Sequence, residues 1–344
     1  MSSQLPLLEP PHQDDAAPLV VLTERGLYCP MGDFYIDPSR AVQTAVITHG
    51  HGDHLRSGSV RYLLAQPGLG IARHRLGRGH SITPLEYGSP CQIGAARVSL
   101  HPAGHILGSA QVRIEHAGRV WVVSGDYKRQ SDPTCAPFET VPCEVFVSEA
   151  TFASPAFQWS PTGQVIESIV AWWRGNRDRG ISSVLYCYAL GKAQRVLAEL
   201  APFIDEPIYV HGAVAALCHS YARAGVALPC AHVPRELRSP SYRGALVIAP
   251  PNAAGTSWLR RFGESATALC SGWMARPDER VGRRYDRGFA LSDHADWPGL
   301  IATCLESGAR RVLFMHGESD TIVRALAERG VSAGALGAAV QYSI

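Results

Sequence analysis

The fold of this chain is decided by the stretch Thr48–His54, THGHGDH, which places three imidazoles and a carboxylate within six positions. The stretch directly follows a short apolar run that predicts a strand, so we expect it at the end of that strand. Alternate residues of an extended segment point the same way, so His49 and His51 can share one target while Asp53 and His54 turn toward a neighbouring one. Such ligands suit zinc in a site that keeps a position open for water. A His-rich surface loop is the alternative.

Three further ligand-type residues stand just past the ends of apolar runs. A lone histidine at such a place commonly has only a structural role, so each is weak evidence by itself. Together with the first cluster they supply seven ligands, enough for two metals that share one carboxylate. If these runs are strands, their ends converge on one edge of a sheet, where loops carry function. The three residues are His105 after Arg97–Leu100, Asp126 after Val120–Ser124, and His316 after Arg311–Met315.

Composition excludes several classes of protein. The 344 residues suffice for about two domains. With 46% hydrophobic and 18% charged residues, the chain is of ordinary globular composition. Nine scattered cysteines without CxxC spacing argue against a disulfide framework or a cysteine-zinc site. No apolar run reaches the length of a membrane span, and the first residues lack a signal peptide's pattern, so we expect a cytoplasmic protein with no membrane partner.

The pattern of the chain changes near Gln164. Before it, short Val- and Ile-rich runs predict strands; after it, helices alternate with strands, as in an α/β unit with a parallel sheet. We therefore predict one domain interrupted by another, with boundaries at 18–160, 161–286 and 287–344. The predicted strands are Ala45–Thr48, Val145–Ser148, Ser183–Tyr188, Ile208–Val210, Ala245–Ala249 and Gly288–Ser292; the predicted helices are Val165–Arg174, Ala193–Leu200, Ala213–Ala224 and Asp320–Arg329.

These motifs resemble a known family. The cluster HGHGDH, His105 and Asp126 resemble successive motifs of the metallo-β-lactamase superfamily. Glu149 in SEAT, His294 in SDHAD and the MHGE histidine are similar to the additional motifs of its β-CASP nucleases. Within that branch, GLYCPMGDFYIDP, HPAGHILGSAQVR, WVVSGDYK, YALGKAQR and LSDHADWPGL resemble the bacterial ligase-associated DNA exonucleases. The likeness runs from residue 26 to residue 300.

The resemblance implies an αββα sandwich with an inserted α/β β-CASP domain. It assigns one metal to His49, His51 and His105, a second to Asp53, His54 and His316, and Asp126 as the bridge between them. The ions would be zinc, with manganese as the alternative. Many relatives carry Ala or Ser where this chain has Gly50 and Gly52, which predicts a softer loop here. Because RNA-processing members share the histidine at 316, RNA stays open as a substrate.

The same resemblance implies a mechanism. Two metals would activate water and neutralise charge on the phosphoryl oxygens. The catalytic residues would be Asp53, His294 and Glu149. His294 would protonate the leaving sugar oxygen, and Glu149 would orient its imidazole and keep it charged. A structural carboxylate that caps a turn is the alternative for Glu149.

The substrate groove has two candidate parts. Lys192 and Arg195 stand in the first turn of a predicted helix after Gly191, a natural phosphate site, although an ordinary strand-to-helix connection with solvated charges explains them equally well. Arginines between Trp273 and Tyr285 suit a single strand whose bases stack, or a solvated loop.

The function predicted is a two-metal exonuclease on DNA, single-stranded or at a duplex end. It would act in bacterial DNA repair with an ATP-dependent DNA ligase and a helicase. A β-CASP ribonuclease is the alternative enzyme, and a metal-free nucleic-acid-binding scaffold is the alternative from another class. The intact ligand set argues against the scaffold.

Overall fold

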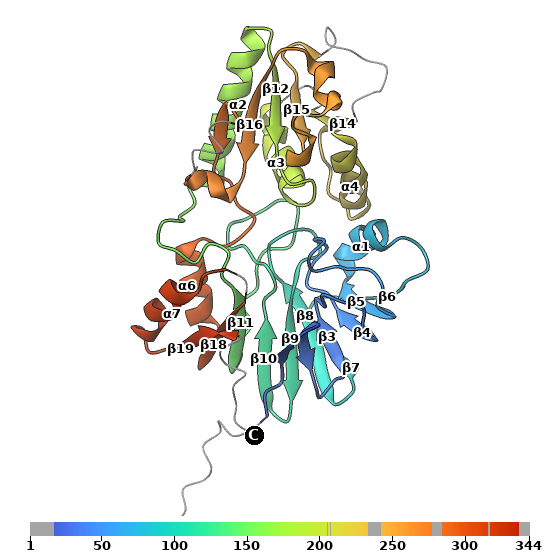
Figure 1. Ribbon diagram of the computed structural model, residues 1–344, viewed down its shortest axis with the longest axis vertical. Coiled ribbons are helices and arrows are strands. Elements are labelled where there is room, and N and C mark those ends of the chain that lie inside the picture. Colours follow the sequence, from blue (N-terminus) through green and yellow to red (C-terminus); the bar gives the residue numbers. More distant parts are fainter. Residues whose placement is uncertain are drawn as a thin grey trace, which may run out of the picture.

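Three sheets organise the computed structural model, which describes residues 17–204, 206, 208–232, 242–276, 284–315 and 317–336. In the first sheet, strands β1 to β3 form antiparallel hairpins and β3 to β6 run parallel. It lies in the lower half of the molecule (Figure 1). Its strands, in spatial order, are β1 (Val21–Thr23), β2 (Gly26–Cys29), β3 (Phe34–Ile36), β4 (Thr44–Val46), β5 (Arg61–Ala65) and β6 (Ser81–Leu85).

The second sheet is mixed. Strands β7 to β10 form an antiparallel meander, whereas β10, β11, β18 and β19 run parallel. Because β8 and β10 are both antiparallel to β9, the carboxyl ends of β8, β10, β11 and β18 share one edge. The strands are β7 (Cys91–Ile93), β8 (Ala96–Pro102), β9 (Ala110–His116), β10 (Arg119–Val123), β11 (Val145–Glu149), β18 (Arg311–Met315) and β19 (Ser332–Ala335).

The first two sheets pack face to face around one apolar core. Leu27 and Val46 on one sheet meet Val112 and Val147 on the other in this core. The outer face of the first sheet is covered by α1 (Leu69–Leu76). The outer face of the second is covered by two helices, so the layers run helix, sheet, sheet, helix. These two helices are α6 (Trp297–Glu306) and α7 (Asp320–Ala327).

The third sheet is parallel and lies wholly between β11 and β18 in sequence. Since β11 and β18 pair directly, the chain leaves the second sheet, builds the third, and returns. The strands are β12 (Ser182–Tyr186), β13 (Ile208–Val210), β14 (Cys230–His232), β15 (Leu246–Ala249), β16 (Ser265–Cys270) and β17 (Arg287–Phe289), with helices α2 (Thr162–Asp178), α3 (Lys192–Leu200) and α4 (Gly212–Arg223).

The mixed α/β class predicted from the sequence is confirmed. The predicted strand Arg311–Met315 is β18, and the predicted helix near Ala213 is α4. Figure 1 shows the third sheet above the other two, with α1 and α4 facing each other at the junction. Among the described residues, no helix combines the length and apolar character that crossing a bilayer requires. The exact domain boundaries stay a prediction.

Candidate metal centre

The ligand-type residues gather at the edge where four strands of the second sheet end. His105 follows β8, Asp126 follows β10, and Glu149 is the last residue of β11. The HGHGDH stretch joins them from the first sheet, because the backbone N–H of Ala110 donates to the carbonyl of Thr48 at 2.7 Å. The seventh predicted ligand, His316, falls outside the described residues, so its position stays a prediction.

A left-handed glycine lets the two sheets meet at this point. Gly125 has φ +56°, and a Cβ there would lie 2.6 Å from Cβ of Thr48. No larger residue fits without moving the backbone. The close approach brings Asp126 beside the first histidine of the cluster, with its Oδ2 3.5 Å from Nε2 of His49.

Three imidazoles direct one nitrogen each at a common centre. Nδ1 of His51 lies 2.9 Å from Nε2 of His49 and 3.1 Å from Nε2 of His105. With Asp126 they form a group whose candidate ligand atoms all lie within 4.8 Å of one another. A tetrahedron of zinc ligands with bonds of about 2.0–2.1 Å has edges of about 3.3 Å. The nitrogens are therefore spaced as ligands of one ion.

The outer nitrogens of His51 and His105 are held by carbonyl acceptors, which fixes the tautomers of these two rings. Nε2–H of His51 donates to the carbonyl of Leu190 at 3.1 Å, and Nδ1–H of His105 to that of Asp293 at 2.7 Å. Carbonyl oxygens only accept, so these protons must sit on the outer nitrogens. The inner nitrogens of the neutral rings are bare lone pairs pointed at one another. Such an arrangement calls for a cation, as metal-binding histidines commonly show.

The pKa values of the three histidines agree with a metal site. Burial lowers the pKa values of His49 and His105 and lowers that of His51 to about 4. The three rings are therefore neutral at pH 7 and can offer lone pairs. A cation bound among them needs no proton to be displaced from these rings.

The predicted ligands of a second ion lie beside the first group. Nε2 of His54 lies 3.7 Å from the Oδ2 atoms of both Asp53 and Asp126, so Asp126 faces the two positions at once. The outer Nδ1 of His54 lies 2.7 Å from Oδ2 of Asp37. Burial opposes the charged ring, but the Asp37 carboxylate raises the pKa of His54 to about 9.

Asp37 was missed by the sequence analysis. It follows the strand β3, just as the predicted ligands follow theirs, and that signal was available in the run GDFYIDP. Its carboxylate also accepts from the backbone N–H of Thr48 at 2.8 Å, and its backbone has φ +46°. Asp37 therefore fixes both the orientation of His54 and the loop that carries the cluster.

The predicted acid pair lies beside the metal residues. Nδ1 of His294 is 2.8 Å from Oε2 of Glu149, and the ring of His294 lies with its centre 4.7 Å from that of His105, tilted by 54°. Glu149 is fully buried and also accepts from the backbone N–H of Tyr127 at 2.7 Å and from the hydroxyl of Thr151. Burial opposes the imidazolium, but Glu149 raises the pKa of His294 to about 9. The pair can hold a proton on His294 near neutral pH.

A cavity of about 520 Å³ opens over this edge. Its walls come from both parts of the chain, since Asp53 and Asp126 face Tyr188 and Trp273 of the inserted segment. His294 is 22% exposed and lines the same cavity. A substrate in this cavity would meet the metal residues and the candidate acid together.

Lys192 and Arg195, the predicted phosphate site, are buried and paired with a carboxylate. They are 3% and 0% exposed, and they lie 3.0 and 3.6 Å from Oδ1 of Asp293. Arg195 also donates to the carbonyl of Ser292 at 2.6 Å. Asp293 compensates both cations, and Asp132 lies 3.9 Å from Nε of Arg195, so a structural role explains these contacts, and the phosphate site stays a prediction. Of the two, only Lys192 touches the cavity wall.

The two glycines of the cluster lie close to side chains of α1. A Cβ at Gly50 would lie 2.5 Å from Cγ2 of Ile71 on α1, and one at Gly52 would lie 3.1 Å from the guanidinium of Arg75. Alanine at position 50 would therefore have to displace the side chain of Ile71. The softer loop stays a prediction.

No family model matches the chain. The chain is 32% identical over 323 residues, 93% of its length, to a "Probable DNA ligase" from Opitutus terrae. It is 30% identical over 150 residues to the "Endoribonuclease ysh1" of Emericella nidulans, and 32% identical over 148 residues to the "Transcription termination factor FttA" of Pyrococcus abyssi. These two likenesses cover 40% and 39% of the chain.

The chain spans only part of each relative. It covers 31% of the ligase-named protein, 16% of the endoribonuclease and 22% of the termination factor. The first likeness extends over nearly the whole chain and so includes both the metal centre and the inserted segment.

Proposed function

We propose that this chain is a metal-dependent nuclease of the β-CASP branch of the metallo-β-lactamase fold, and that its substrate is DNA. The observation that carries the proposal is the convergence of three inner imidazole nitrogens, with Asp126 beside them and the His294–Glu149 pair alongside. The helix, sheet, sheet, helix order and the sheet inserted between β11 and β18 support this fold and the boundaries 18–160, 161–286 and 287–344.

Most of the site residues would bind metal ions, and one would donate a proton. His49, His51 and His105 would hold one ion, and Asp53 and His54, with His316, would hold the other, zinc or manganese, with Asp126 shared. When bound, two such ions supply an activated water and neutralise charge on the phosphoryl oxygens.

His294 donates the proton that the leaving sugar oxygen needs. Its Nδ1–H is engaged by Glu149, so the proton that reaches the cavity is the one on Nε2. Glu149 holds the ring in place through a bond at 2.8 Å and favours its charged form. An alkoxide leaves poorly without a proton, so this pair completes a phosphodiester hydrolysis.

Aromatic side chains beside the metal centre support a nucleic-acid substrate. Tyr188 and Trp273 are 59% and 50% exposed, which is unusual for such large rings, and both line the metal cavity. They also line a neighbouring pocket of about 330 Å³ with Arg276 and Tyr285. Bases stack on exposed aromatic rings, each with a free energy of about 1–3 kcal/mol. A nucleotide strand can thus place a phosphodiester at the metals and a base in this pocket.

The choice of DNA rests on the relative whose likeness covers the chain. That relative is named for DNA ligase, which supports a role as a ligase-associated exonuclease in DNA repair. A ribonuclease is the second candidate, because a relative over 40% of the chain is named an endoribonuclease. The two enzymes would share the metal centre and differ in how they treat the 2′-hydroxyl.

The test is digestion of matched DNA and RNA strands labelled at either end, by protein loaded with zinc or manganese. We expect stepwise shortening of DNA from one end, with RNA degraded more slowly, and complete loss of activity on chelation. An Asp126→Ala protein purified in parallel reports contaminating nuclease. Internal cuts in RNA with intact DNA would favour the ribonuclease. No hydrolysis of either strand by a chain with two bound metals would refute the proposal.

A further inference from the structure

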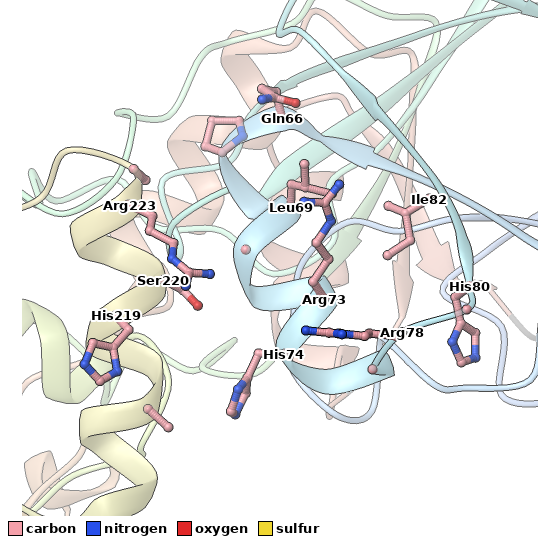
Figure 2. Close-up of a pocket in the computed structure, with 16 residues that line it drawn as sticks. Gln66, Leu69, Arg73, His74, Arg78, His80, Ile82, His219, Ser220 and Arg223 are labelled. Atoms are coloured by element: carbon pink, nitrogen blue, oxygen red, sulfur yellow. The ribbon is translucent and has the colours of Figure 1, made fainter.

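A basic groove lies at the junction of α1 and α4, outside the metal cavity. It has a volume of about 1170 Å³, and Figure 2 shows Arg73 and His74 on α1 across from Arg223 and His219 on α4. Arg78, just beyond α1, also lines it. We call it the α1–α4 groove.

The charge of the groove departs from that of the chain. The whole sequence is nearly balanced, with 32 Lys and Arg against 30 Asp and Glu. The groove lining, within the residues that the structure describes, has three arginines and three histidines and no carboxylate. Arg73, Arg78 and Arg223 are exposed, and in the described parts of the chain none of them forms an ion pair or a side-chain hydrogen bond. Three cations gathered without a counter-charge form an anion-binding surface.

Shared lining residues connect the groove to the metal centre. A third pocket, of about 790 Å³, shares His74 with the groove and shares Gly52 and Arg75 with the metal cavity. Arg56 also lines this intermediate pocket, and its described lining likewise has no carboxylate. A row of arginines therefore leads from the HGHGDH loop, past α1, to α4.

The two walls of the groove are fixed relative to each other. Gly70 of α1 approaches Ser220 of α4 so closely that a Cβ at Gly70 would lie 3.4 Å from that of Ser220. Beneath the groove, Ile71 packs with Leu217 and Tyr221 in an apolar cluster. Anion-binding side chains on both helices thus have a set spacing, which lowers the entropy lost on binding.

We propose that the α1–α4 groove binds the sugar-phosphate backbone of the substrate strand, several nucleotides from the bond that is cut. This inference rests on the proposed function and extends it. The connection to the metal centre favours a polymer over a small anion, because a free phosphate would need only one pocket. The arginines contact phosphates and read no sequence, so the groove holds the strand in register while the aromatic pocket takes a base.

The test removes three arginines at once and compares two variants with equal change of charge. The groove variant is Arg73→Gln/Arg78→Gln/Arg223→Gln. The control variant changes three exposed arginines that line none of these pockets, Arg25→Gln, Arg260→Gln and Arg329→Gln. Fluorescence anisotropy then follows the binding of labelled oligothymidylate and oligouridylate, each of about 20 nucleotides, in excess chelator, from about 50 to 200 mM salt. No cleavage occurs, so the result does not depend on activity.

We expect the groove variant to bind both strands roughly 100-fold more weakly at about 0.1 M salt, because each single-strand phosphate contact contributes about 0.7 to the slope of log affinity against log salt. The slope itself should fall by about 2. The control variant should lose less than threefold, and circular dichroism should show both variants folded. Three results would each contradict the proposed role of the groove. They are equal losses of affinity in the two variants, an unchanged salt slope in the groove variant, and a wild-type chain that binds neither strand.

The outcome is separable from that of the proposed function. If only the groove variant loses affinity and the wild-type chain cuts neither strand, the groove proposal stands and the nuclease proposal is refuted. Cleavage by a chain whose groove variant binds like the control would keep the nuclease and reject the groove. A difference in affinity between oligothymidylate and oligouridylate would show whether the groove prefers DNA or RNA.

Discussion

Replacing His294 by alanine should remove the proposed proton donor and leave the proposed metal centre intact. The ring donates to Glu149 at 2.8 Å and is not among the inner nitrogens that converge at the first metal position. We expect kcat on DNA to fall by about 10²–10⁴, the usual contribution of a positioned general acid. That loss is about 3–5 kcal/mol of transition-state stabilisation, at 1.36 kcal/mol for each tenfold.

The structure also sets the cost in stability. Glu149 is 1% exposed and keeps two donors, the backbone N–H of Tyr127 and the hydroxyl of Thr151, when the imidazole is gone. One lost hydrogen bond to a charged group costs about 1.5–3 kcal/mol, so the variant should fold. His101→Ala is the matched control, because Nδ1 of His101 meets Glu139 at 2.9 Å in a pair of the same kind outside the cavity.

The assay compares two leaving groups. A sugar alkoxide needs a proton, whereas nitrophenolate leaves well unaided, so His294→Ala should be much less impaired on bis(p-nitrophenyl) phosphate than on DNA. Glu149→Gln should show the same selective loss in milder form, because it only orients and charges the ring. The reasoning is refuted if His294→Ala slows both substrates equally while its metal content, measured by mass spectrometry, is unchanged. Equal slowing with lost metal would make His294 a ligand.

Four other expectations concern the metal content of the chain, Asp37, Asp293 and Trp273. The purified protein should carry close to two divalent ions per chain and His316→Ala about one; full occupancy in that variant would contradict the assignment. Asp37→Asn, whose asparagine tolerates the φ of +46°, should lower the affinity for the second ion by about 10–100-fold in a chelator competition. An unchanged affinity would show that Asp37 does not support the second ion. Asp293→Ala leaves buried Lys192 without its carboxylate and Arg195 with only Asp132, 3.9 Å away, so urea unfolding should show a loss of about 3–5 kcal/mol; a smaller loss would mean that water reaches the two cations. Trp273→Ala should raise KM for DNA with little change in kcat, since a lost stacking contact removes uniform binding, and an unchanged KM would show that the ring does not touch the strand.

The sequence by itself indicated several of the strands and helices and most of the residues of the candidate metal centre. The HGHGDH cluster could be found because its ligands are neighbours in the chain and a strand fixes their direction. His105 and Asp126 could be found because each follows an apolar run, and carboxyl ends of like-directed strands share an edge. Glu149 and His294 came only from resemblance to a family. In the structure they meet across 145 positions of sequence.

Only the tertiary structure decided which groups hydrogen-bond to the candidate ligands and which basic side chains are left exposed. The carbonyls of Leu190 and Asp293 set the tautomers of two histidines from segments 139 and 188 positions away. Lys192 and Arg195 have the pattern of a phosphate site, but they became buried because Asp293 packs against them. The α1–α4 groove exists because two helices from different parts of the chain meet at Gly70 and Ser220. Local sequence fixes what a residue can bind, but the long-range packing of the chain decides whether that residue faces a partner, the core or a ligand.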